Sequence, residues 1–218
     1  MPPFQDELRR ILRSYSLPEV SADVLARMAL LDRLLVERSK GLDLVGFRSD
    51  EERLLRYFVE PLAARPYVPA RVDEALDIGS GGGTPALPLA LLIPQSRWTL
   101  LEPRRKKALF LEDAARALGL PGVRVSTDRF QGSLPSGAWD LITTRGVKLG
   151  KREIEGILGG LRPAGRFLWF SGEARLAEGA SDLAKRGGAD VRGPLRILGA
   201  VSRSSLLVVG TREGECFT

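Results

Sequence analysis

One stretch of the sequence, residues 76–88, constrains the fold more than any other. The apolar run 72–78 carries an acid, Asp77, near its end and is followed by glycines at positions 79, 81, 82 and 83. A stretch compatible with a helix comes next. Glycine is needed in such a turn because only a residue without a Cβ lets the backbone bend sharply and a ligand lie against the main chain. The pattern therefore predicts a strand, a ligand-binding turn and a helix, in that order.

The acid before this turn bears on which ligand the turn binds. A carboxylate two residues before Gly79 repels a pyrophosphate but attracts an ammonium or sulfonium group. Pro85, in the first helical turn, has no N–H to offer a phosphate. These two residues favour S-adenosylmethionine over a dinucleotide, with Asp77 binding the methionine end directly or through water.

A dinucleotide, and with it a nicotinamide-dependent reductase, is the alternative. The frame formed by Gly81, Gly83 and Ala86 fits the relaxed fingerprint G-x-G-x-x-A. Glu102 closes a second apolar stretch, residues 98–101, where a carboxylate can accept hydrogen bonds from both hydroxyls of a ribose. Both classes of enzyme use such an acid, so Glu102 does not choose between them. A glycine-rich turn that binds no ligand is a further alternative.

Composition sets the class of protein. A chain of 218 residues with 44% apolar residues can hold one large domain, or one domain and a small appendage. There is no run of 18 apolar residues, the first residues are not typical of a signal peptide, and Cys216 is the only cysteine. We therefore expect a cytoplasmic protein with no internal disulfide and no membrane partner. A monomer is favoured.

Histidine is absent from the sequence. This removes the commonest general base and the commonest metal ligand. With a single cysteine as well, we expect no metal site. The chemistry must use other side chains or need no base, and the sequence assigns no catalytic residue.

The net charge of +6 lies entirely in residues 71–218, because residues 1–70 hold as many acidic as basic side chains. A basic surface attracts phosphate backbones, although basic runs are also common on solvated helix faces. The candidate nucleic-acid-binding residues are Arg104, Arg105, Lys106, Lys148, Lys151 and Arg152.

The hydrophobic pattern changes along the chain. Residues 1–68 read as a helical N-terminal segment, with Leu25, Met28, Leu31 and Leu35 at helical spacing and a helix from Ser49 or Asp50 to Pro61. Residues 69–218 alternate strands with helices, which predicts a doubly wound, mostly parallel α/β sheet ending in an antiparallel edge hairpin. The expected strands are 72–78, 97–101, 123–126, 139–143, 166–170 and 204–210, with a weaker one at 195–201. The expected helices are 85–93, 104–118, 149–161 and 174–187.

Several segments of this domain resemble those of one family, the bacterial small-subunit 16S rRNA guanine-N7 methyltransferases, or glucose-inhibited division protein B (GidB) family. The resemblance runs from about Leu25 to Val209. Its segments are the turn from Asp77 to Leu89 with both prolines, the stretch Leu100–Leu111 with its acid and basic run, Arg129–Gln131, Asp140–Gly146 (family D-x-x-x-S-R-A) and Gly165–Leu168.

The resemblance implies a seven-stranded, Rossmann-like class I methyltransferase fold, S-adenosylmethionine as cofactor, and ribosomal RNA or the small ribosomal subunit as partner. By this resemblance, the residues that contact the cofactor are Gly79, Thr84, Phe130, Gln131 and Arg145, and Glu102 binds its ribose. Phe130 is equally typical of a core residue. Asp77, Gly81 and Gly83 of the turn complete the predicted cofactor-binding set.

This chain departs from the family around the acceptor pocket. It has Val45 in place of the family's Thr in N-L-T, Tyr57, Glu60 and Pro61 where the family reads R-H-x-x-D-S, and Ser171 in place of a Lys. The cofactor is therefore supported more firmly than its acceptor. A methyltransferase with another acceptor and a degenerate RNA-binding relative remain alternatives.

Guanine N7 is an acceptor that suits a chain without histidine. This nitrogen has a free lone pair and carries no proton, so the protein need only align it and exclude water. The N7-methylated product is cationic, and Glu60 is a candidate for stabilising the developing charge.

We predict that Asp77→Ala weakens the binding of S-adenosylhomocysteine more than tenfold, about 1.4 kcal/mol, because the carboxylate no longer meets the cationic end of the ligand. Isothermal titration calorimetry measures this. A wild-type protein that binds nothing at millimolar ligand would overturn the cofactor assignment.

Overall fold

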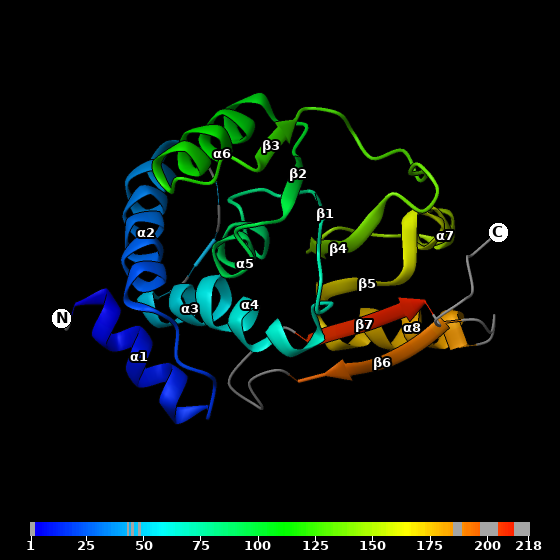
Figure 1. The fold of residues 1–218 in the computed structure, drawn as a ribbon, viewed down its shortest axis with the longest axis horizontal. Coiled ribbons are helices and arrows are strands. Elements are labelled where there is room, and N and C mark those ends of the chain that lie inside the picture. The colour runs from blue at the N-terminus through cyan, green and yellow to red at the C-terminus, as the bar shows by residue number, and fades with distance from the viewer. Residues whose placement is uncertain are drawn as a thin grey trace.

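A seven-stranded sheet with the order β3-β2-β1-β4-β5-β7-β6 forms the centre of the computed structural model (Figure 1). The structure describes residues 3–42, 44, 46–47, 49–184, 189–196 and 205–211. Its strands are β1 (Glu74–Ile78), β2 (Arg97–Leu101), β3 (Val123–Ser126), β4 (Trp139–Arg145), β5 (Leu161–Ser171), β6 (Ala189–Leu195) and β7 (Ser205–Thr211). Strands β1 to β5 are parallel, and β7 is antiparallel to both β5 and β6. The predicted doubly wound sheet with an antiparallel edge hairpin is confirmed.

Helices cover both faces of the sheet and define two apolar cores. One core joins α5 (Ala86–Leu92) and α6 (Arg105–Ala117) to the sheet. The other joins α7 (Lys151–Gly160) and α8 (Glu173–Ala184) to the opposite face. Side chains alternate between these cores along each strand, since successive residues of a strand point to opposite faces.

The N-terminal helices pack on the α5–α6 side. They are α1 (Phe4–Ser14), α2 (Ala22–Leu42), α3 (Asp50–Leu54), a π-helical turn η1 (Leu55–Val59), α4 (Glu60–Ala63) and the 3-10 turn η2 (Arg65–Tyr67). Figure 1 shows α2 beside α6, and the predicted apolar stripe of α2 is buried in the shared core. This segment therefore covers the outside of the α5–α6 layer. The division of the chain at residue 68 stays a prediction. Within the described residues, no helix combines the length and apolar character needed to cross a membrane.

The helix that begins at Asp50 does not end at Pro61 as expected. Ser49 caps it, accepting a hydrogen bond from the Glu52 N–H. The chain then widens into the π-turn η1 and continues as α4 to Ala63. Pro61 has no N–H to donate to the Tyr57 carbonyl four residues earlier, and this carbonyl accepts from the Thr84 hydroxyl instead.

The weaker strand expected near 195–201 can be compared with the structure only at its first two residues. The strand β6 covers Ala189–Leu195, and residues 197–201 lie outside the described part of the chain. An edge strand has one neighbour and needs no apolar run, and β6 tolerates Pro194 next to a register shift. The other strands and helices agree with the expected ranges to within a few residues, apart from β5, which begins at Leu161 rather than residue 166.

A buried ion pair connects α2 to α3. The Arg53 guanidinium donates to both carboxylate oxygens of Asp32, at 2.6 and 3.3 Å, and also contacts Asp50. We predict that Asp32→Ala lowers the free energy of unfolding by about 3 kcal/mol, because it leaves a buried charge with only its more exposed partner. Urea denaturation measures this change. The control Asp6→Ala removes the exposed pair with Arg9 and should leave the unfolding midpoint nearly unchanged.

Candidate functional site

The glycine-rich turn lies where β1 ends between β2 and β4, the point at which the strand order reverses. Doubly wound sheets bind ligands in the crevice at this point. Gly79, Gly81 and Gly83 have φ angles of +73°, +55° and +96°. A Cβ on Gly79 would stand 2.6 Å from the Val147 side chain. Both the backbone conformation and the space therefore require glycine here, as the sequence predicts.

Glu102 holds this turn from the next strand. Its carboxylate accepts hydrogen bonds from the Gly81 N–H at 2.8 Å and from the Arg104 N–H at 2.9 Å. The Gly81 N–H is thereby used within the protein. Each carboxylate oxygen keeps a second lone pair, so Glu102 can still accept from a ribose hydroxyl.

Asp77 is buried beside the turn, with 1% of its surface exposed. Strand register pairs it with Thr143 of β4, whose hydroxyl donates to Asp77 Oδ1 at 2.6 Å. The other oxygen, Oδ2, is buried and has no hydrogen-bond partner within the described part of the chain. Burial raises the pKa of Asp77 to about 6, against the hydrogen bond from Thr143. An unpaired buried acceptor is costly and fits a cationic group supplied by a ligand.

Arg145, at the end of β4, faces the same side of the sheet as Asp77. Its guanidinium pairs with the Glu60 carboxylate at 2.6 Å and lies over the Phe170 ring, 4.8 Å from the centroid. Its Nε and Nη2 atoms make no hydrogen bond to any described residue. Two guanidinium nitrogens of Arg145 can therefore still donate to a ligand, while Glu60 of α4 fixes the position of its side chain.

Tyr57 of η1 packs against the glycine-rich turn on this same side of the sheet. A Cβ on Gly82 would overlap the Tyr57 hydroxyl oxygen. The Thr84 hydroxyl donates to the Tyr57 carbonyl at 3.2 Å, so this predicted cofactor residue turns its side chain toward η1. The sequence suggested Tyr57 only as a departure from the family pattern. The alternation along β4, which puts Thr143 and Arg145 on one face, could have pointed to Thr143.

A pocket of 270 Å³ opens on the other side of Gly79. Its lining includes Phe130, which also packs against the second core, and Lys148. Gln131 follows Phe130 and is exposed. The remaining lining residues are Ile78, Leu101, Pro103, Asp128, Arg129, Val147, Leu149 and Glu153. The structure thus separates the predicted cofactor residues into two groups. Phe130 lines the pocket, whereas Asp77, Thr84 and Arg145 lie on the side of the sheet covered by η1 and α4.

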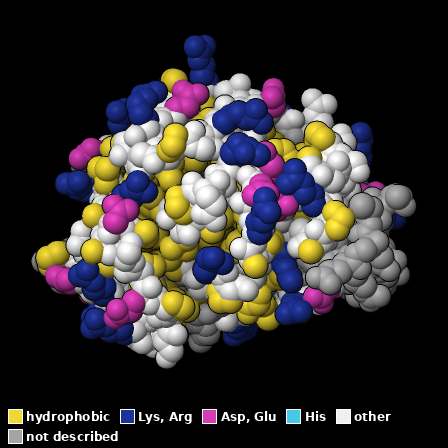
Figure 2. Space-filling view, viewed as in Figure 1, with side chains coloured by type: hydrophobic (Ala, Val, Ile, Leu, Met, Phe, Trp, Pro, Cys, Tyr) yellow, Lys and Arg dark blue, Asp and Glu magenta, His cyan; other side chains and the backbone are white. Residues whose placement is uncertain are grey.

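The six candidate nucleic-acid-binding side chains are all exposed. Three follow β2 and three follow β4, so they lie at the same edge of the sheet as the glycine-rich turn. On the face shown in Figure 2, Lys and Arg side chains are spread among Asp and Glu side chains rather than gathered in one patch. Their position at the site edge, rather than charge density, is what distinguishes these six.

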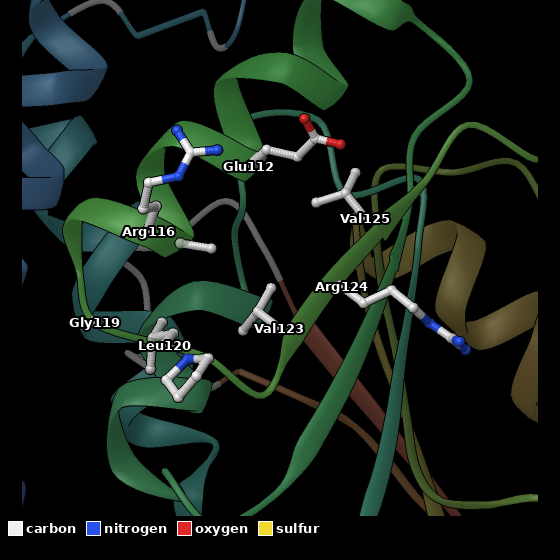
Figure 3. Close-up of a pocket in the computed structure, with 9 residues that line it drawn as sticks. Glu112, Arg116, Gly119, Leu120, Val123, Arg124 and Val125 are labelled. Carbon is white, nitrogen blue, oxygen red and sulfur yellow. The ribbon is translucent and has the colours of Figure 1, made fainter.

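A second pocket, of 470 Å³, lies between the end of α6 and β3 at the outer edge of the sheet (Figure 3). Leu120 and Val123 line it, with Glu112 and Arg116 beside them, while the Arg124 side chain points away from it. It shares no residue with the turn or with the pocket at Gly79, so it is not part of this site.

Comparison with known proteins identifies the family. The family described as rRNA small subunit methyltransferase G matches residues 25–186. Ribosomal RNA small subunit methyltransferase G of Solibacter usitatus is 35% identical over 190 residues, which cover 84% of this chain and 87% of that protein. The chain belongs to this family. The Xanthomonas campestris pv. campestris relative of the same name is 33% identical over 194 residues, covering 87% of this chain and 88% of its own length.

Solved structures agree on the fold. A SAM-dependent methyltransferase from Aquifex aeolicus superposes with a TM-score of 0.56 at 13% identity, covering 74% of this chain and 93% of its own. A branched-chain polyamine synthase mutein from Thermus thermophilus superposes with a TM-score of 0.59 at 17% identity. The match covers 86% of this chain and 65% of that protein. At these identities the likeness shows the fold alone. It confirms the predicted Rossmann-like class I methyltransferase fold.

The raised pKa of Asp77 gives the site a pH dependence. Below about pH 6 the carboxyl is protonated in the ligand-free protein, so a cationic ligand group loses its partner. We predict that the affinity for S-adenosylhomocysteine falls about tenfold from pH 7 to pH 5, by the linkage of proton and ligand binding. Calorimetry at both pH values measures this. Asp77→Asn should bind more weakly at pH 7 and lose most of the dependence; an unchanged dependence would assign it to another group.

Proposed function

We propose that this chain transfers a methyl group from S-adenosylmethionine to guanine N7 in small-subunit ribosomal RNA. Membership of the rRNA small subunit methyltransferase G family carries the proposal. The unpaired Asp77 oxygen beside the glycine-rich turn supports the cofactor half, because a dinucleotide would bring phosphates next to this acid.

The described residues fit the cofactor. The carboxylate of Asp77, held by Thr143, receives the cationic end of the amino-acid part. Glu102 accepts from the ribose, and the pocket at Gly79 and Phe130 takes the base. Gly83 lets the chain turn back toward α5 without a side chain in the way. When bound, S-adenosylmethionine supplies a methyl group already activated by its positive sulfur.

The protein's own part in the reaction is alignment and exclusion of water. Guanine N7 offers a lone pair and needs no deprotonation, which agrees with a sequence that has no histidine. Glu60 is fully buried and paired with Arg145. A part for Glu60 in stabilising the cationic product stays a prediction, and its carboxylate would act there together with the Arg145 guanidinium.

The exposed basic residues would hold the RNA. Arg104, Arg105 and Lys106 begin α6, and Lys148, Lys151 and Arg152 surround the start of α7. Phosphate contacts of this kind position a nucleic acid without reading its sequence. Because both groups flank the turn, a bound strand would pass across the opening of the cofactor site.

The decisive experiment offers immature small ribosomal subunits and their naked RNA to the full chain with methyl-labelled S-adenosylmethionine. We predict labelled N7-methylguanosine, detected by mass spectrometry of the digested RNA. Asp77→Ala should lose at least tenfold in kcat/KM for the donor, since it removes the charge partner of the cofactor. The control Asp113→Ala, on the exposed side of α6, should retain full activity.

Two other outcomes separate the alternatives. Label in another nucleotide or a small molecule would mean a methyltransferase with a different acceptor. Binding of S-adenosylhomocysteine and of subunits without any methylated product would identify a degenerate RNA-binding relative.

A further inference from the structure

The π-turn η1 brings a phenol to the cofactor turn. The Glu60 N–H bonds to the Leu55 carbonyl, five residues back, which widens the helix at this point. Such π-turns occur frequently at functional sites. Here the widened turn directs the Tyr57 side chain against Gly82, where only the lack of a Cβ leaves room for its hydroxyl.

The Tyr57 hydroxyl is buried and unpaired. The residue is 1% exposed, and its oxygen makes no hydrogen bond to any described residue. An unsatisfied buried hydroxyl is costly, and such groups need an explanation. Burial raises the pKa of Tyr57 well above its ordinary value, so the hydroxyl keeps its proton at neutral pH and can donate.

Several donors lie on the side of the sheet that this hydroxyl faces, and the Leu44 carbonyl also lies close to Gly82. Arg145 has Nε and Nη2 atoms without hydrogen bonds, and its charge acts on Tyr57. Within the described turn, the N–H groups of Gly79, Ser80, Gly81 and Gly83 are used. The N–H groups of Gly82 and Thr84 make no hydrogen bond to any described residue. A set of donors beside a cation is typical of a carboxylate site.

Asp77 provides a carboxylate acceptor on the same side of the sheet. Asp77 Oδ2 is unpaired, and its charge also acts on Tyr57. An acceptor for a cation beside donors for an anion matches the two charged groups of an α-amino acid. S-Adenosylmethionine carries such an end.

We propose that the Tyr57 hydroxyl is a cofactor-binding group that donates a hydrogen bond to the α-carboxylate of the amino-acid end, with Arg145 providing the positive charge and Asp77 receiving the ammonium. This rests on the proposed function, because it assigns one contact to the cofactor named there. Glu60 is a positioning residue in this arrangement, since it holds Arg145 in place.

The test compares three ligands on the full chain by calorimetry. S-Adenosylhomocysteine has the complete amino-acid end, S-adenosyl-3-thiopropylamine lacks only the carboxylate, and 5′-methylthioadenosine lacks the whole end. We expect Tyr57→Phe to bind the first about tenfold more weakly, as for a lost hydrogen bond to a charged group, and the other two as wild type does. The control Tyr67→Phe makes the same change in η2 and should leave all three affinities unchanged.

Thermal unfolding gives a second measurement independent of activity. Without ligand, Tyr57→Phe should have an equal or higher Tm, because it removes a buried hydroxyl that has no partner. The stabilisation by S-adenosylhomocysteine should be smaller than in wild type.

The outcomes distinguish this inference from the proposed function. If Tyr57→Phe binds all three ligands as wild type does, or loses equally on all three, the carboxylate contact is wrong while the cofactor assignment stands. A lower Tm without ligand would mean that the hydroxyl serves the fold, which also overturns the inference. If wild type binds none of the ligands, the proposed function fails and this contact fails with it.

Discussion

The parallel pairing of β1 with both β2 and β4 is the constraint on which the site depends. Pairing with β2 lets the Leu101 carbonyl accept from the N–H groups of Gly79 and Ser80, and places Glu102 where it bonds to Gly81. Pairing with β4 sets Thr143 beside Asp77. A shift of one residue in either register would turn these side chains to the opposite face of the sheet. The glycine-rich turn, the position of Asp77 and the hydrogen bond from Gly81 to Glu102 therefore all depend on these two strand registers.

The site keeps several polar groups in a state that folding alone does not favour. Asp77 Oδ2, the Tyr57 hydroxyl and part of Arg145 are buried without hydrogen bonds among the described residues. Each such group lowers the free energy of unfolding, because it has lost water and gained nothing in return. Unpaired donors and an unpaired acceptor on one side of the sheet are what a ligand with charges of both signs would satisfy. Stability and ligand binding are thus opposed at these residues.

The N-terminal helices have a second role besides covering apolar surface. α2 and α6 share a core, which explains the apolar stripe of α2. η1 and α4 also supply Tyr57 and Glu60, which complete the face of the site that the sheet leaves open. These are among the residues in which the chain departs from the family pattern. Part of this departure therefore lies beside the glycine-rich turn, while the residues that line the pocket at Phe130 all fall between Ile78 and Glu153.

The sequence by itself determined the sheet class, most strands and helices, the glycine-rich turn and the carboxylates Asp77 and Glu102. These follow from hydrophobic period and from residues whose backbone needs are local, such as Gly79 at positive φ. It did not predict the strand Ala189–Leu195, because an edge strand needs no apolar run, and it ended a helix at Pro61, because a π-turn cannot be read from local propensity. Only the tertiary structure decided that Tyr57 meets Gly82, that Glu60 pairs with Arg145 and that Thr143 bonds to Asp77. Those contacts join residues far apart in the chain, and strand register and helix packing, rather than sequence spacing, bring them together.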